Sequence, residues 1–164
     1  MEYSLERLKK CMCTDGFVDY DSVDLSGIDE DMIPILIELN EKDWVTCYSC
    51  SGHMEEIKKC GTWNAYIAFH LDNNTPPPNI PLYDLKDKKH NYSEKKELGK
   101  YNGYFYYWYG DKTKNEQEQE KERKELMKEL LEWAKGLPVN DKYVSRTKIE
   151  DGWLIYDGMK LFEI

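Results

Sequence analysis

TWNAYIAFHL, residues 62–71, alternates apolar side chains with polar or small ones. Successive side chains of a β-strand point to opposite faces, so this alternation predicts a strand with one buried face. The residues that share the buried parity are Trp63, Ala65, Ile67, Phe69 and Leu71. Further helices and strands are predicted on both sides of this strand in the sequence.

A helix is predicted before the strand, over residues 31–40. Its apolar residues recur at helical spacing: Met32, Ile35, Leu36 and Leu39, with Ile33 and Ile37 widening the face. Asp29 or Asp31 suits the N-cap, because a carboxylate there accepts hydrogen bonds from the free amides of the first turn. Pro34 lies in the first turns, where its missing N–H matters least.

A longer helix is predicted over residues 115–138. Its apolar face consists of Leu126, Met127, Leu130, Leu131, Trp133 and Ala134. Gly136 and Pro138 are typical of the end of a helix. The first two turns are nearly all Glu, Gln and Lys, so we expect the charged run 115–125 to be a solvated face.

The remaining segments are shorter or less regular. Further strands are predicted at 43–49, 101–109 and in the tail after 142, with turns at 150–152 and 156–158. Short helices are predicted over 2–10, with Tyr3, Leu5 and Leu8 available for packing, and over 54–60. Residues 72–81 read as a loop because three consecutive prolines remove backbone donors, and the Lys-rich run 85–100 reads as an exposed short helix or loop.

This order of elements predicts one α+β domain spanning residues 1–164. We expect a mixed or antiparallel sheet packed against two main helices. With 164 residues, 40% hydrophobic and 13% aromatic, the chain is long enough to bury a core without a metal or disulfides. No internal repeat or linker is visible in the sequence.

The acidic balance of the chain limits its partners. It carries 32 Asp and Glu against 23 Lys and Arg, a formal charge of −9. Binding to nucleic acids relies on Lys and Arg that displace counterions from phosphates, so a large nucleic-acid partner is not expected. Self-association into a homo-oligomer stays open.

The N-terminal stretch and the cysteines indicate a compartment. MEYSLERLKKCMC has charges throughout and lacks the apolar run of a secretory signal, and no apolar stretch is long enough to span a bilayer. Five cysteines without an export signal suit a reducing environment. We therefore expect a cytoplasmic protein that does not bind membranes.

The stretch WVTCYSCSGHMEE, residues 44–56, concentrates groups that could carry chemistry. A structural zinc site is one interpretation, because Cys47, Cys50 and His53 have C-x-x-C-x-x-H spacing and Cys11 with Cys13 forms a second pair. A redox-active or nucleophilic cysteine is another, since C-x-x-C can act as a dithiol. Buried cysteines without a ligand are the common alternative to both.

Ligand binding uses more residues of the same stretch. If the strand turns at Ser51 and Gly52, backbone N–H groups there form an anion-binding nest, and Gly52 allows the backbone to approach a ligand closely. We therefore expect Gly52→Val to abolish binding with little loss of fold. The predicted ligand-binding residues are Ser49, Cys50, Ser51, Gly52 and His53 as donors, Tyr48, Trp63 and Tyr66 as aromatic walls, and His70 at a strand end. A Ser-Gly turn that satisfies its own backbone is the alternative.

The segment around residues 31–71 resembles a known family. Ser49, Cys50, Ser51 and Gly52 match the Ser-Cys-Ser-Gly part of the signature of the wybutosine-synthesis tRNA methyltransferases, and TWNAYIAFH resembles their following strand. That family uses S-adenosylmethionine to methylate a modified guanine in tRNA, so the resemblance implies a pocket at the motif. His53 stands where the family has arginine. Small proteins of low-GC Gram-positive bacteria and their phages are similar in carrying a Ser-Cys-Ser-Gly-His core.

This resemblance implies a binding function. We expect a non-catalytic protein that sequesters a nucleotide-derived ligand, such as a cyclic nucleotide or an ADP-ribose-type immune signal of a phage host, and needs no cofactor. The alternatives are an S-adenosylmethionine-dependent methyltransferase and a zinc-stabilised interaction protein.

Overall fold

The predicted strand TWNAYIAFHL is a central strand of the fold, β2, Asn64–His70. A computed structural model describes residues 2–12, 25–70, 77–81, 90–98, 101–142, 147–156 and 159–163. In it β2 has a strand on each side, in a four-stranded sheet of order β1-β2-β4-β3 whose neighbours are all antiparallel. The strands around it are β1, Thr46–Cys50, β3, His90–Leu98, and β4, Tyr101–Tyr109.

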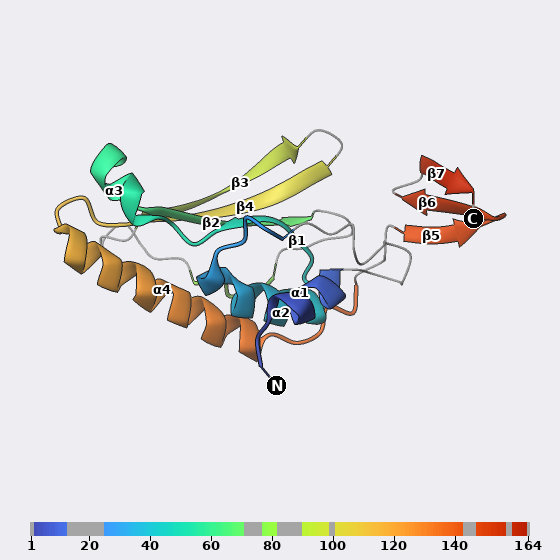
Figure 1. The fold of residues 1–164 in the computed structure, drawn as a ribbon, viewed down its shortest axis with the longest axis horizontal. Helices are drawn as coiled ribbons and strands as arrows, with labels where there is room; N and C mark the ends of the chain where they lie inside the picture. The colour runs from blue at the N-terminus through green and yellow to red at the C-terminus, as the bar shows by residue number, and fades with distance from the viewer. Residues whose placement is uncertain are drawn as a thin grey trace.

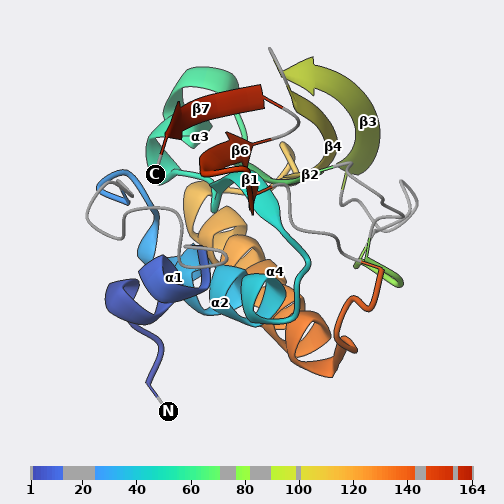
Figure 2. The ribbon, with the colours of Figure 1, turned by 90° about the vertical axis from the view of Figure 1, so that its right-hand side faces the viewer.

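Three helices cover one face of this sheet (Figure 1). They are α1, Leu5–Met12, α2, Ile33–Glu41, and α4, Glu116–Gly136. The main core lies between them and the sheet, and its fully buried side chains include Leu8, Ile35, Leu39, Ile67, Leu126 and Leu130. Figure 2 shows α1 and α2 beside α4 beneath the strands. The α+β class, with an antiparallel sheet packed against helices, is therefore confirmed.

The alternation in β2 separates the two faces of the sheet. Ala65, Ile67 and Phe69 belong to the helix-facing core, as predicted. Ala68 lies on the opposite face, where it is buried together with Phe105 and Tyr107 of β4. β2 thus contributes to two separate apolar clusters, because its side-chain period is two.

The helix boundaries follow local signals. α4 begins after Asn115, whose side chain accepts the N–H of Glu118 at 2.9 Å, and the helix ends at Gly136 as predicted. A 3₁₀ turn, η3, Glu30–Met32, precedes α2, and Pro34 lies in the first turn of α2. Leu8 of α1 is buried, whereas Leu5, which we expected to pack, is about half exposed.

Residues 90–98 of the Lys-rich run predicted as a short helix or loop are instead the edge strand β3, and the rest of that run lies outside the described residues. The nine residues of β3 pair with β4 in a continuous register from His90 opposite Tyr109 to Leu98 opposite Tyr101. The local composition did not reveal this strand, because its Lys and Glu residues show no alternation. Such charged residues are nevertheless common on edge strands. The open edge of the aromatic strand β4 provides the partner that the local sequence does not show.

The start of α4 also differs from the prediction of a solvated face. Gln119, Glu122 and Arg123 are buried there. Gln119 donates to the backbone carbonyls of Gly61 and Lys114 at 3.0 and 3.1 Å. Polar side chains are buried at this end because they bond to loops rather than because they are apolar, and a hydropathy pattern does not detect that.

Strands in the tail are confirmed, and they form a second sheet. β5, Thr147–Glu150, β6, Trp153–Tyr156, and β7, Met159–Glu163, are antiparallel neighbours in that order. The predicted turn after Glu150 uses Asp151 and Gly152, both with positive φ, as tight hairpins require. The other predicted turn includes 157–158, which lie outside the described residues. None of the helices described has the length and apolarity needed to cross a membrane.

Candidate functional site

The motif loop lies at the end of β1, an edge strand of the four-stranded sheet, and leads into the short helix α3, Met54–Cys60. A second segment meets it there. Asp29, just before η3, accepts the backbone N–H of Ser51 through Oδ2 at 2.9 Å. We call Asp29 together with Cys50, Ser51, Gly52 and His53 the β1 corner.

Three chemically different side chains converge at the β1 corner. One potential ligand atom from each of Asp29, Cys50 and His53 lies within 4.8 Å of the other two. Cys50 Sγ is 3.5 Å from His53 Nε2, which is 3.7 Å from Asp29 Oδ1. The side chain of His53 is 52% exposed and that of Asp29 is 21% exposed, so solvent reaches the group.

The backbone amides of Ser51 and Gly52 are bonded within the protein. Asp29 takes the N–H of Ser51, and the N–H of Gly52 donates to Cys50 Sγ at 3.4 Å. The hydroxyl of Ser51 is buried, 3.5 Å from the carbonyl oxygen of Gly52. The two amides expected to form the anion nest, those of Ser51 and Gly52, are therefore occupied by the protein's own carboxylate and thiol, as the alternative of an internally satisfied turn predicts for them.

Gly52 is required by the protein rather than by a ligand. Its φ is +82°, and a Cβ atom there would lie 3.2 Å from the carbonyl oxygen of Asn64, 3.3 Å from the ring of Trp63 and 3.4 Å from Arg123 Cδ. The close approach is thus to β2 and α4. Gly52→Val would strain the fold as well as any site, so the expectation of intact folding is wrong.

Arg123 of α4 is hydrogen-bonded to the corner. Its Nη1 donates to Asp31 Oδ2 at 2.8 Å and to the Ser51 carbonyl at 3.4 Å, and its Nη2 donates to Glu120 at 2.9 Å. Burial by itself lowers the pKa of Arg123, but hydrogen bonds to Glu120 and Asp31 outweigh it and leave the pKa raised. The guanidinium is a fixed positive group that anchors the loop. Asp31, which the sequence suggested as a helix N-cap, is an ion-pair partner of this guanidinium.

The thiol of Cys50 is not activated in the described structure. Burial raises its pKa most, and the negative charges of Asp29 and Glu56 raise it further, against the lowering effect of the Gly52 N–H. A nucleophilic or redox cysteine needs a positive environment that stabilises the thiolate. The corner has the opposite charge, and the side chain of Cys47, the other half of the C-x-x-C motif, lies outside the described atoms.

Trp63 and Tyr66, two of the aromatic residues predicted as pocket walls, do not share one face. Trp63 is buried in the main core, 1% exposed, and presents no ring face to a ligand. Tyr66 lies on the opposite side of the sheet, with its ring centroid 5.9 Å from that of Tyr107 and 6.2 Å from that of Phe105. The two rings therefore cannot line one pocket at the β1 corner.

The other predicted residues lie along the strands. Ser49 is half-buried in β1 opposite Ile67. Tyr48 and His70 pair through their backbones with Ala68 and Gly103, and their side chains are outside the described atoms. The structure thus places Cys50, Ser51, Gly52 and His53 together, with Trp63 packed against Gly52 from the core and Tyr66 opposite Cys50 in the register of β1 and β2.

The predicted zinc set is only partly assembled. Cys50 and His53 are together, but Cys11 lies on α1, where its thiol donates to the carbonyl of Leu8 at 3.1 Å. Cys13 and the side chain of Cys47 lie outside the described atoms. The third group near Cys50 and His53 is Asp29, which sequence reasoning considered only as a cap.

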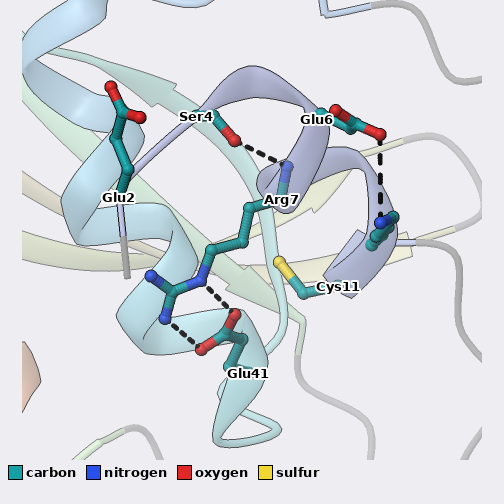
Figure 3. A pocket seen from close by; sticks show the side chains of 7 residues that line it. Glu2, Ser4, Glu6, Arg7, Cys11 and Glu41 are labelled. Atoms are coloured by element: carbon teal, nitrogen blue, oxygen red, sulfur yellow. Dashed lines mark hydrogen bonds and ion pairs between the residues drawn. The ribbon is translucent and has the colours of Figure 1, made fainter.

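A surface hollow of about 490 Å³ lies along α1 instead (Figure 3). It is lined by Glu2, Ser4, Glu6, Arg7, Lys10, Cys11 and Glu41. The guanidinium of Arg7 is held by both carboxylate oxygens of Glu41, at 2.7 and 2.8 Å. Of the predicted site residues only Cys11 lines it, so this hollow does not replace the β1 corner as the candidate site.

Two residues that hold the motif loop, Asp29 and Arg123, are not predicted by the sequence to lie near it. Asp29 stands 22 positions before the amide it binds, and Arg123 stands 72 positions after Ser51. The only signal in the sequence was that Arg123 is one of three arginines in a lysine-rich chain. An arginine within a Glu- and Lys-rich helix is compatible with burial when carboxylates pair with it.

Comparisons with known proteins add no relative: no protein-family model, no curated protein and no solved structure matches the chain. The resemblance to the wybutosine-synthesis methyltransferases therefore stays a prediction from the motif.

Proposed function

We propose that this chain is a binding protein that holds a small nucleotide-derived molecule at the β1 corner and releases it chemically unchanged. The observation that carries the proposal is the convergence of Asp29, Cys50 and His53 on one solvent-accessible point. A carboxylate accepts and an imidazole donates or accepts hydrogen bonds, which suits the polar edge of a base or the hydroxyls of a ribose.

The rigidity of the corner supports binding. Gly52 is packed against Trp63 and Asn64, and Arg123 holds the Ser51 carbonyl, so the loop is fixed by tertiary contacts. A site that is already ordered loses less conformational entropy when a ligand binds. The amides of Ser51 and Gly52 are already bonded, so we assign recognition to side chains and not to an amide nest around phosphate.

The state of the thiol supports binding without turnover. Burial keeps the pKa of Cys50 above its usual range, and a neutral thiol is a poor nucleophile. Sequestration needs affinity alone. The ligands we propose are cyclic nucleotides and ADP-ribose derivatives, which a phage protein of this kind would withdraw from a host's immune signalling.

Thermal-shift measurements with a ligand panel test the proposal. The panel contains cyclic mononucleotides, cyclic dinucleotides, ADP-ribose derivatives and S-adenosylmethionine. A ligand at 100 times its Kd stabilises the fold by about 2.7 kcal/mol, which raises the Tm of a chain of this size by roughly 5–10 °C. Denaturing the complex is expected to return the ligand intact by mass spectrometry, and recovery of a cleaved product contradicts the proposal.

Two variants locate the site. His53→Ala removes a half-exposed imidazole and is expected to abolish the thermal shift without changing the Tm of the free protein. Glu55→Ala, at an exposed position in α3 two residues away, is the matched control and is expected to keep the shift. A shift that appears only with S-adenosylmethionine would instead favour the methyltransferase alternative.

A further inference from the structure

The spacing of the three side chains at the β1 corner matches the geometry of a metal site. A tetrahedral zinc ion with ordinary bond lengths holds a sulfur and an imidazole nitrogen about 3.6 Å apart, and a carboxylate oxygen and the nitrogen about 3.4 Å apart. In the structure Cys50 Sγ and His53 Nε2 are 3.5 Å apart, and His53 Nε2 and Asp29 Oδ1 are 3.7 Å apart. These two distances are within a few tenths of an ångström of the tetrahedral values, and a ligand atom of each of the three side chains lies within 4.8 Å of the other two.

Hydrogen bonds hold two of the three groups in this orientation. Asp29 accepts the Ser51 N–H through Oδ2, which leaves Oδ1 directed at His53. The N–H of Gly52 donates to Cys50 Sγ, a contact that stabilises a metal-bound thiolate. Such outer partners orient the ligands of a metal and tune its affinity.

The charge around the corner favours a cation. The carboxylate of Asp29 lies in the corner, 3.7 Å from His53 Nε2, and Glu56 follows three residues after His53 in α3. Glu56 is fixed in place, because its Oε2 accepts the backbone N–H of Asn64 at 2.8 Å. The positive charge of Arg123, whose Nη1 donates to the Ser51 carbonyl, is paired with Asp31 and Glu120.

We propose that the β1 corner binds a zinc-class transition-metal ion through the carboxylate of Asp29, the thiolate of Cys50 and Nε2 of His53. A thiolate ligand selects zinc and related ions against magnesium and calcium, which prefer oxygen. On binding, the thiol of Cys50 gives its proton to solvent, and the ring proton of His53 resides on Nδ1.

This site differs from the structural zinc interpreted from the C-x-x-C spacing. It uses Asp29 and needs neither Cys11 nor Cys13. Three protein ligands leave the fourth position of a tetrahedral ion to water or to a donor atom of a bound molecule, as in zinc sites that bind substrates. The inference comes from geometry and charge and needs no nucleotide. With the ion bound, Asp29 and His53 Nε2 are its ligands, so a nucleotide-derived molecule would be held through the fourth position of the ion and not by hydrogen bonds to those two groups.

Cobalt binding by the full chain tests the site. The purified protein is stripped with a chelator and titrated with Co²⁺, which takes the same geometry as zinc and reports its ligands optically. We expect one equivalent to bind, with the visible bands of tetrahedral cobalt and a sulfur-to-cobalt charge-transfer band. Zn²⁺ is expected to displace the cobalt, because it binds such sites more tightly. Failure to bind either ion overturns the proposal without bearing on the nucleotide panel.

Variants assign the ligands. Cys50→Ser is expected to lose the charge-transfer band, and His53→Ala and Asp29→Asn to weaken cobalt binding by more than about 100-fold, since even outer partners account for 10–100-fold. Cys60→Ser, at an exposed cysteine of α3, is the matched control and is expected to bind as the parent does.

Two results would overturn the assignment. One is a charge-transfer band that survives Cys50→Ser and disappears in Cys47→Ser, which would indicate the C-x-x-C cysteine instead. The other is unchanged affinity in His53→Ala, a variant whose folding is checked by circular dichroism. Because the side chain of His53 is half exposed, this variant keeps the test valid even where Asp29→Asn disturbs the fold.

Discussion

Arg123 donates from Nη1 to the carbonyl oxygen of Ser51 at 3.4 Å, across 72 positions of sequence. The same nitrogen donates to Asp31 at 2.8 Å. One buried guanidinium therefore ties the motif loop, the turn before α2 and helix α4 together. The position of the β1 corner depends on this tertiary contact as much as on its own sequence.

Arg123→Met is expected to destabilise the protein by about 2–3 kcal/mol. The change removes a buried cation, takes from Asp31 its ion pair with Arg123 and takes from Glu120 the nearer of two cations. Urea unfolding measures the loss. Lys124→Met is the control, because the side chain of Lys124 is 70% exposed and lies 3.7 Å from the same Glu120, and it is expected to cost under about 0.5 kcal/mol. Equal losses of unfolding free energy in the two variants would contradict the role of Arg123 in holding the loop.

Gly52→Ala is expected to cost more than Gly61→Ala. Both glycines have positive φ, +82° and +83°, so both substitutions carry a backbone penalty of about 1–2 kcal/mol. A Cβ atom at Gly61 meets nothing within 4 Å, whereas one at Gly52 presses on Asn64, Trp63 and Arg123. The difference in unfolding free energy between the variants isolates the packing term. A Gly61 variant as unstable as the Gly52 variant would contradict the close approach.

Glu122→Gln is expected to destabilise the protein by about 1–2 kcal/mol. The buried carboxylate of Glu122 accepts the Asp111 N–H and pairs with Lys114 Nζ, both at 2.8 Å, and the amide keeps only the first acceptor. Thermal unfolding measures the effect. Glu125→Gln, at an exposed position of the same helix, is expected to change stability by less than about 0.5 kcal/mol.

The hydrogen bond of Tyr3 gives a pH-dependent contribution to stability. Its hydroxyl donates to Glu38 at 2.6 Å, and this bond is the main cause that raises the pKa of Tyr3 from 10.0 to about 12. A raised pKa in the folded state means that the stabilisation is fully present below about pH 10 and is lost as the pH rises through about 12.

Tyr3→Phe is therefore expected to cost about 1.5 kcal/mol near neutral pH, the usual contribution of a hydrogen bond to a charged acceptor. The difference between the parent and the variant is expected to shrink between about pH 10 and pH 12. Urea midpoints of both proteins at several pH values measure it. A difference that is constant with pH would assign the effect to packing instead of the hydrogen bond.

Segments with a strong period were predictable because their pattern is local. The alternation in residues 62–71 and the helical spacing in 31–40 correspond to β2 and α2, since one buried face requires one period. β3 was missed because its Lys and Glu residues carry no such pattern, and only the register with β4 defines it as a strand.

The sequence by itself determined the α+β class, the strand β2 and the grouping of Cys50, Ser51, Gly52 and His53 in one loop. Local spacing and backbone preference are enough for these features, because their residues are neighbours in the chain. Tertiary structure alone decided that Asp29 joins Cys50 and His53, that Arg123 supports Ser51, and that Trp63 and Tyr66 are separated. Side-chain contacts across tens of residues depend on the packing of whole elements, which no local pattern encodes.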